Sequence, residues 1–319
     1  MKKRIFIALL LSVILILSAC GGGGGEQGVR LSMATGGTGG TYYPFGGVMA
    51  SVINNNTDIN VTVNASGASA DNIRQIAAGD AHVAIVQNDV MSYAFNGTEI
   101  WSASEPVKSM ATLMSLYPET VHVIVTEESG IYSIEDLAGK RVSIGDVGSG
   151  VEANARQVLA AHGLGTDDIN VFNLGFSPSA DAMRDRQLDA FFVTSAAPNT
   201  AVMDLAQARD LRVLNITNEK IDQLMNTHPY YVRVTLTQSD YTFLTEAINT
   251  VAVQATLIAT ADMDEQVAYD IVKALIENQP DILAGHARGA YISAENAVQS
   301  ISVDFHPGAR RYFEEIGAL

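Results

Sequence analysis

The sequence of 319 residues contains 35 acidic and 19 basic residues, a formal net charge of −16, and a single cysteine. Such an acidic surface repels nucleic acid and anionic lipid headgroups, so neither is expected as a partner. One cysteine excludes an internal disulfide, and the length is typical of two domains of about 150 residues each.

The N-terminal residues have the order of a secretory signal. A basic start over 1–4 precedes an apolar run over 5–17, which is shorter than the roughly 20 residues of a transmembrane helix. Leu17-Ser18-Ala19-Cys20 resembles a bacterial lipoprotein cleavage site, and lipidation would account for the unpaired thiol. We therefore predict secretion across the cytoplasmic membrane, with a signal peptide over 1–19, a lipid anchor at Cys20 on the periplasmic or outer face, and a tether over 20–28. A permanent membrane helix is the alternative.

The folded part is expected to begin with a strand over 29–33, a glycine-rich loop over 36–41 and a helix over 42–53. The loop lacks the third glycine of a dinucleotide-binding fingerprint and the Gly-Lys-Ser/Thr ending of a phosphate loop. Free N–H groups at a helix start still suit an anion such as a carboxylate. We predict ligand contacts at Gly39, Gly40, Thr41 and Tyr42, with a plain tight turn as the alternative.

A second helix is expected to open at Ser69, and a strand over 83–86 follows it. Polar side chains come directly after that strand, at the end where binding residues collect in α/β sheets. Amide side chains there can both donate and accept hydrogen bonds. We therefore predict ligand contacts at Ser69, Gln87 and Asn88, with helix capping as the alternative for the amides.

Segments 121–125 and 251–258 are predicted as strands that carry the chain between two lobes. This predicts lobe 1 over 29–118 plus 259–319 and lobe 2 over 119–258. Tyr117 could stack on a ligand at the first crossing, and Glu119 could accept a hydrogen bond from an ammonium group. An exposed hinge glutamate is the alternative for Glu119.

The second half repeats the first, with a strand over 141–144, a glycine-rich loop over 145–150 and a helix over 151–162. Strands alternating with helices predict an α/β fold with mainly parallel sheets and a ligand cleft between two similar lobes. Ser149, Gly150, Val151 and Pro198 are the predicted contacts of this half, although Ser149 could be a plain helix cap. Later helices are predicted over 263–276, over 294–301 and from 306 onwards.

Nothing in the sequence predicts catalysis or a cofactor. The six histidines are scattered without His-Glu-x-x-His spacing, and no second cysteine could complete a metal site. Ser149 has Val147 two places before it, where a nucleophile elbow needs glycine. We predict no catalytic residues, no metal, no cofactor and no enzymatic activity.

Several separate segments resemble one known family in the same order, across about residues 30–317. They are MATGGTGGTYYP at 33–44, LYPE at 116–119, DLAGKRV at 136–142, GSG at 148–150 and HPGA at 306–309. These resemble the TAXI family of TRAP-transporter solute receptors. The resemblance implies a two-lobed type II periplasmic-binding-protein fold and a ligand such as glutamate, 2-oxoglutarate or another small carboxylate. It also implies delivery to a TRAP-type membrane permease subunit.

Carried over residue by residue, the resemblance favours Gly40, Thr41, Tyr42, Gln87, Tyr117, Glu119, Ser149 and Gly150 as ligand contacts. We find no arginine placed to clamp a carboxylate, so Ser, Thr and backbone N–H donors are expected to hold it. The alternatives are an extracellular enzyme on the same scaffold, which would need a titratable pair in the cleft, and a sensor subunit. Membrane contact is expected only through the lipid anchor.

Overall fold

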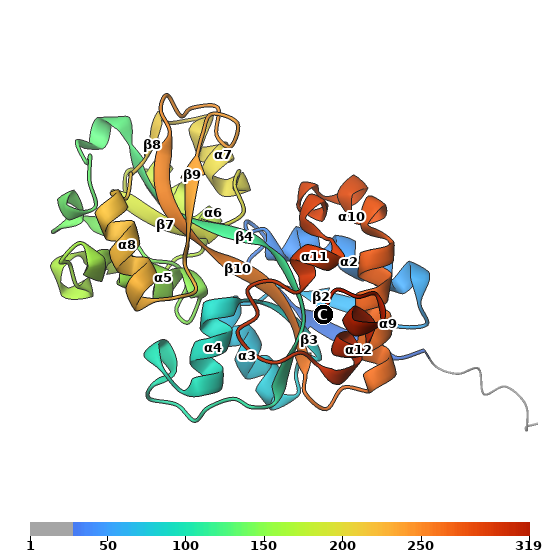
Figure 1. The fold of residues 1–319 in the computed structure, drawn as a ribbon. Helices are drawn as coiled ribbons and strands as arrows, with labels where there is room; N and C mark the ends of the chain where they lie inside the picture. The colour runs from blue at the N-terminus through green and yellow to red at the C-terminus, as the bar shows by residue number, and fades with distance from the viewer. Residues whose placement is uncertain (1–27) are drawn as a thin grey trace, which may run out of the picture.

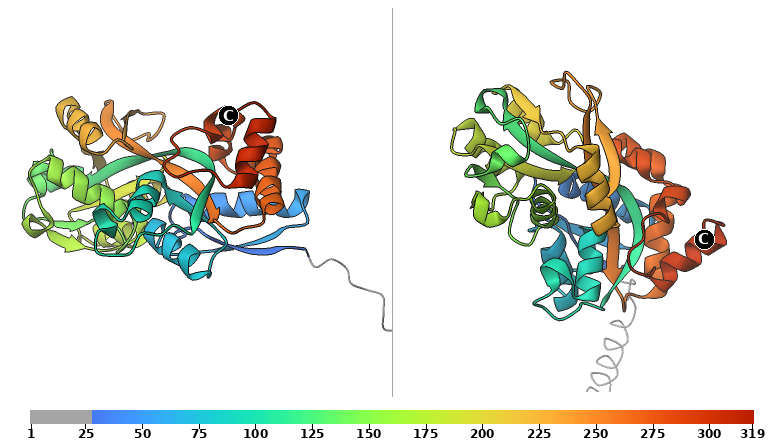
Figure 2. Two further views of the ribbon diagram at one scale, coloured as in Figure 1. Left: turned by 60° about the horizontal axis from the view of Figure 1, so that its bottom comes forward. Right: turned by 60° about the vertical axis from the view of Figure 1, so that its left-hand side comes forward.

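The computed structural model describes residues 28–319, so the predicted signal peptide and the predicted lipid anchor at Cys20 lie outside the described residues. Figure 1 shows two groups of helices on either side of two long strands, and the views in Figure 2 keep this arrangement. Along one curled sheet lie β2 (Asn60–Asn64), β1 (Arg30–Ala34), β3 (Val83–Gln87), β10 (Ile248–Thr260), β4 (Met110–Thr126), β7 (Ala190–Ser195), β5 (Arg141–Ser143) and β6 (Asn170–Phe172), with β8 (Leu211–Val213) paired to β4 and β9 (Val232–Leu236) paired to β10. Among residues 28–319, no helix is long and apolar enough to cross a membrane.

Lobe 1 is built from β1, β2 and β3 and the helices that cover them. These helices are α2 (Tyr42–Asn56), α3 (Ser69–Ala78), α4 (Asn88–Asn96), α9 (Glu265–Glu277), α10 (Gln279–Gly285), α11 (Ala294–Ala297) and α12 (Pro307–Glu315). Phe45, Met49 and Ile53 recur at helical spacing on α2, and all three are fully buried against the sheet. The C-terminal α12 packs on α9, so the two ends of the described chain belong to one lobe (Figure 1).

Lobe 2 is built from β5 to β9 and the helices α5 (Gly150–Ala161), α6 (Phe176–Arg184), α7 (Thr200–Ala206) and α8 (Asn218–Thr227). Its cores are separate clusters from those of lobe 1. One contains Val142, Val158 and Phe192, and the other contains Phe191 and Tyr241. Short 3-10 helices complete the fold at Glu99–Trp101, Glu127–Ser129, Glu135–Leu137, Thr166–Asp168 and Ala287–Tyr291.

The long strands β4 and β10 belong to both lobes. β10 pairs with β9 of lobe 2 up to Ala252 and with β3 of lobe 1 from Ala255 onwards. Register shifts interrupt the β4–β10 pairing beside this change of partner. The pairing therefore changes lobes a few residues before position 258, where the sequence places the boundary. That boundary could not be read from composition because β10 is apolar on both sides of the change.

The predicted two-lobed α/β fold is confirmed. Parallel pairing holds within the lobes, between β1 and β2 and between β5 and β6, but β4 and β10 pair antiparallel with their neighbours. The helix predicted over 294–301 ends at Ala297. Ser300 has φ of 56°, a left-handed conformation that cannot continue a right-handed helix.

Candidate ligand site between the two lobes

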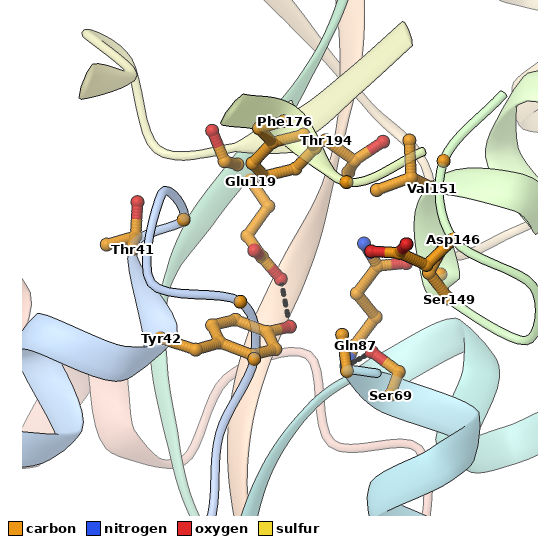
Figure 3. Close-up of a pocket in the computed structure, with 18 of the residues that line it drawn as sticks. Thr41, Tyr42, Ser69, Gln87, Glu119, Asp146, Ser149, Val151, Phe176 and Thr194 are labelled. Carbon is orange, nitrogen blue, oxygen red and sulfur yellow. Dashed lines mark hydrogen bonds between the residues drawn. The ribbon is translucent and has the colours of Figure 1, made fainter. Parts of the chain in front are cut away.

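A cavity of about 70 Å³ lies between the lobes, where five helices begin. Its wall includes the first or capping residues of α2, α3 and α4 from lobe 1 and of α5 and α6 from lobe 2 (Figure 3). The first turn of a helix carries N–H groups without intrahelical partners and the positive end of the helix dipole. The cavity is therefore built to accept negative charge or hydrogen-bond acceptors from both sides.

A cavity of this volume suits a small solute.

One direct hydrogen bond joins two titratable side chains of the wall. Tyr42 Oη donates to Glu119 Oε2 at 2.6 Å, as the dashed line in Figure 3 marks. Burial holds the pKa of Glu119 well above its usual range, and the bond from Tyr42 offsets only part of that effect. Burial and the neighbouring Glu119 likewise raise the pKa of Tyr42. The sequence indicated no titratable pair in the cleft, whereas the structure contains this one.

The wall carries acidic but not basic side chains. Asp146 borders the cavity opposite Glu119 from the loop before α5, and desolvation on the cavity side raises its pKa. Among the described lining residues there is no lysine, arginine or histidine. An anionic group would therefore rest on N–H dipoles and hydroxyls, while the two carboxyl groups suit a cation or a hydrogen-bond donor.

Two buried polar atoms of the wall have no partner in the part of the chain that the structure describes. They are Gln87 Oε1 and Thr194 Oγ1, from residues only 2% and 3% exposed. Buried polar atoms are nearly always hydrogen-bonded, so these two atoms are exceptions in side chains that line the cavity.

Ten of the thirteen sequence-predicted ligand contacts lie in the cavity wall. These are Gly39, Gly40, Thr41, Tyr42, Ser69, Gln87, Glu119, Ser149, Gly150 and Val151. Their contact with a ligand stays a prediction.

The structure places the other three predicted contacts away from the cavity. The Asn88 side-chain amide makes hydrogen bonds within the fold. Its Nδ2 donates to the Ser300 carbonyl, and its Oδ1 accepts from the backbone N–H of Gln254 at 3.0 Å. Tyr117 is fully buried in the core of lobe 1. Pro198 follows a cis peptide bond and is exposed, outside the wall.

Sequence reasoning also missed part of the wall, namely Gly36, Gly37, Ala68, Gly145, Asp146, Gly175, Phe176, Thr194 and Ser195. Asp146 lies in the second glycine-rich loop, and Thr194 ends the apolar run of β7, so position alone could have indicated both. The half-buried Phe176 carries no comparable signal, because an aromatic residue at a helix start is equally suited to a core.

The lobes are in contact in this structure. The Ala70 N–H of lobe 1 donates to the Gly148 carbonyl of lobe 2 at 3.1 Å. A Cβ atom on Gly150 would lie 2.0 Å from Gln87 Oε1, so a larger residue there would displace the Gln87 side chain or hold α5 further away. The structure thus represents a closed form.

Comparisons with known proteins agree on the fold. Three similar solved structures are PhnD1 from Prochlorococcus marinus in complex with methylphosphonate (10% identity, 91% of this chain and 99% of that chain, TM-score 0.56), the aliphatic sulphonate binding protein SsuA from Escherichia coli (15%, 90% and 83%, 0.50), and a binding protein component of an ABC phosphonate transporter from Pseudomonas aeruginosa (10%, 82% and 78%, 0.50). At these low identities, the structural similarity shows a shared two-lobed fold.

The predicted membership of the TAXI family is wrong, because the family model that matches residues 33–317 is that of another family. Short glycine-rich motifs misled the prediction, since in this chain such loops precede several helix starts that face the cavity. The chain belongs to the NMT1-like family.

Proposed function

We propose that the chain is a secreted solute-binding receptor, whose lobes close around one small solute and present it to a membrane permease. The convergence of helix starts from both lobes on one cavity carries this proposal. The orphaned Gln87 and Thr194 oxygen atoms support it, because both belong to side chains that line the cavity and lack a partner among the described residues. A solute that touches both walls binds the closed form better than the open form and so stabilises it.

The charges of the wall support a zwitterionic solute. Its anionic group would lie on the helix starts, and its ammonium group would face Glu119 and Asp146. A dicarboxylate such as 2-oxoglutarate would bring two negative charges to a wall without a cationic side chain. Among small carboxylates, we therefore propose an amino acid such as glutamate in preference to the matching oxo acid.

Thermal unfolding in the presence of matched solutes tests this function. Comparing the midpoints with glutamate and with 2-oxoglutarate isolates the effect of the amino group. Methylphosphonate and an alkanesulfonate test whether another anionic group can take the place of the carboxylate. We expect the midpoint of unfolding to rise with one zwitterion, because a ligand bound only to the native state stabilises it. Equal stabilisation by the oxo acid would reject the proposed role of Glu119 and Asp146. No stabilisation by any solute would reject the receptor itself.

We also propose that lobe 1 spans about 29–118 and 254–319, that lobe 2 lies between them, and that Cys20 anchors the exported chain. The change of pairing partner in β10 supports the second boundary. Fatty-acid labelling of expressing cells tests the anchor: the label should be lost in Cys20→Ala, and label retained in that variant would reject lipidation.

An enzyme is the second candidate, and the Tyr42–Glu119 pair favours it. Buried acid–base pairs with shifted pKa values gather at catalytic sites, although binding sites also contain them. Mass spectrometry of the solute after prolonged incubation separates the two functions, since a receptor returns the solute unchanged and an enzyme does not.

A further inference from the structure

A buried polar network joins the lobes outside the cavity, where α4 of lobe 1 faces α5 of lobe 2 (Figure 1). Asn154 Nδ2 donates to Asp89 Oδ2 and to Tyr231 Oη, both at 2.9 Å. Tyr231 donates to Gln157 Oε1 at 2.6 Å, and Gln157 Nε2 donates to Tyr93 Oη at 3.0 Å. Asp89 is 1% exposed and Asn154 is fully buried, so water does not complete their bonding.

Two oxygen atoms in this network have no partner among residues 28–319. They are Asp89 Oδ1 and Asn154 Oδ1, the second oxygens of two groups that already share one hydrogen bond. Turning the amide of Asn154 would not help, because both of its N–H bonds are already donated. With Asp89 ionised, both orphans are acceptors and neither can serve the other.

We propose that Asp89 and Asn154 together bind one proton in the closed form, carried on Asp89 Oδ1 and donated to Asn154 Oδ1. This adds a second hydrogen bond to the acid–amide pair and satisfies both orphaned oxygens at once. The site exists only when the lobes meet, because Asp89 belongs to lobe 1 and Asn154 to lobe 2. Lobe closing is therefore coupled to proton uptake, which regulates the capture of the solute under the proposed function.

The charges around Asp89 favour its neutral form. Tyr93 on α4, Tyr231 before β9 and Glu119 on β4 are the titratable groups that interact with it, and none of these supplies positive charge. Burial raises the pKa of Asp89 to about 6, although the backbone N–H of Val90 and the Asn154 amide lower it in part.

The sign of the coupling follows from the two states of Asp89. Opening the lobes returns Asp89 to water and to its usual pKa of 3.8, so the closed form binds the proton more tightly. Closing is accordingly favoured as the pH falls through 6 and is weakened as the pH rises. The difference between the two pKa values limits the change in the closed-to-open ratio to about a hundredfold.

Distances between two spin labels in the solute-free protein test this proposal. The exposed Glu105→Cys and Asp167→Cys, one in each lobe, carry the labels in a chain that starts at residue 21 and so lacks Cys20. We expect the closed fraction to fall as the pH rises through about 6. Asp89→Asn should remain closed at pH 8.5, since an amide at position 89 permanently supplies the missing donor.

Asn154→Asp is the matched second variant, and it should raise the pH midpoint of closing. Two carboxyl groups sharing one proton hold it more tightly, so the midpoint should rise above that of the unsubstituted pair. Glu119→Gln tests whether the other buried acid accounts for the pH dependence, and a pH-dependent closing should persist in this variant. The proposal is overturned if the closed fraction does not change between pH 4.5 and 8.5. It is equally overturned if Asp89→Asn keeps the midpoint, if Asn154→Asp leaves it unmoved, or if Glu119→Gln removes it.

Because no solute is present, the outcome is independent of the solute-binding assay. Failure of the proton site would leave the proposed receptor function intact. Failure of every solute to bind would leave a pH-dependent closure standing.

Discussion

Gly150→Ala should weaken solute binding without weakening the fold. The new Cβ would lie 2.0 Å from Gln87 Oε1 and 2.3 Å from its Cδ, against an ordinary contact of about 3.5 Å. Either the buried Gln87 side chain leaves its place in the cavity wall or α5 remains about 1.5 Å further away. Overpacking of this kind costs about 1–3 kcal/mol, which corresponds to about a 5- to 150-fold higher Kd.

Gly47→Ala is the matched control, because nothing lies within 4 Å of a Cβ at that exposed position on α2. Both variants replace a helical glycine, a change that stabilises a helix by up to about 1 kcal/mol where the space allows. Calorimetric titration with the solute found by thermal shift measures Kd, and thermal unfolding without solute measures the fold. Unchanged affinity in Gly150→Ala would refute the argument that this close approach is needed for binding.

Three further changes have separate physical reasons. Tyr42→Phe removes the donor to the buried Glu119 carboxyl and should cost about 1–3 kcal/mol of unfolding free energy in urea. Burial lowers the pKa of His122 to about 4, so as the pH falls below 6.5 the unfolded chain binds a proton at this histidine and the native chain does not. His122→Phe should therefore raise the free energy of unfolding by about 2–3 kcal/mol at pH 4.5 relative to its effect at pH 7.5. An equal effect of the substitution at both pH values would contradict this. Gly308→Ala should lower the thermal midpoint, since its Cβ would lie 2.0 Å from the Glu265 carbonyl oxygen of α9, and overpacking against a helix backbone costs about 1–3 kcal/mol.

The elements with clear periodicity and clear ends could be predicted from the sequence. The helix expected over 42–53 is α2, and the helix expected over 151–162 is α5 shifted by one residue. Both begin after glycine-rich loops and bury regularly spaced apolar side chains. The course of β4 and β10 was not predictable to the same degree, because strand pairing joins segments far apart in sequence and apolar strands give no sign of their partner.

The candidate site could be predicted as far as backbone position determines it. Glycine-rich loops and strand ends led to ten residues of the cavity wall, since the fold brings helix starts together. What surrounds each side chain decided the remainder. Tyr117 and Glu119 are two residues apart on one strand, yet Tyr117 packs in the core of lobe 1 and Glu119 lines the cavity.

The described residues of the cavity wall include no cationic side chain, and this affects how the solute is held. An arginine on one lobe would bind an anion almost as well in the open form as in the closed form. Helix starts on both lobes act within about one turn of their ends, so their combined effect arises only when the lobes meet. The affinity for the solute then depends on how readily the lobes close. Any group that shifts the equilibrium between the open and closed forms, such as Asp89, therefore changes this affinity without touching the solute.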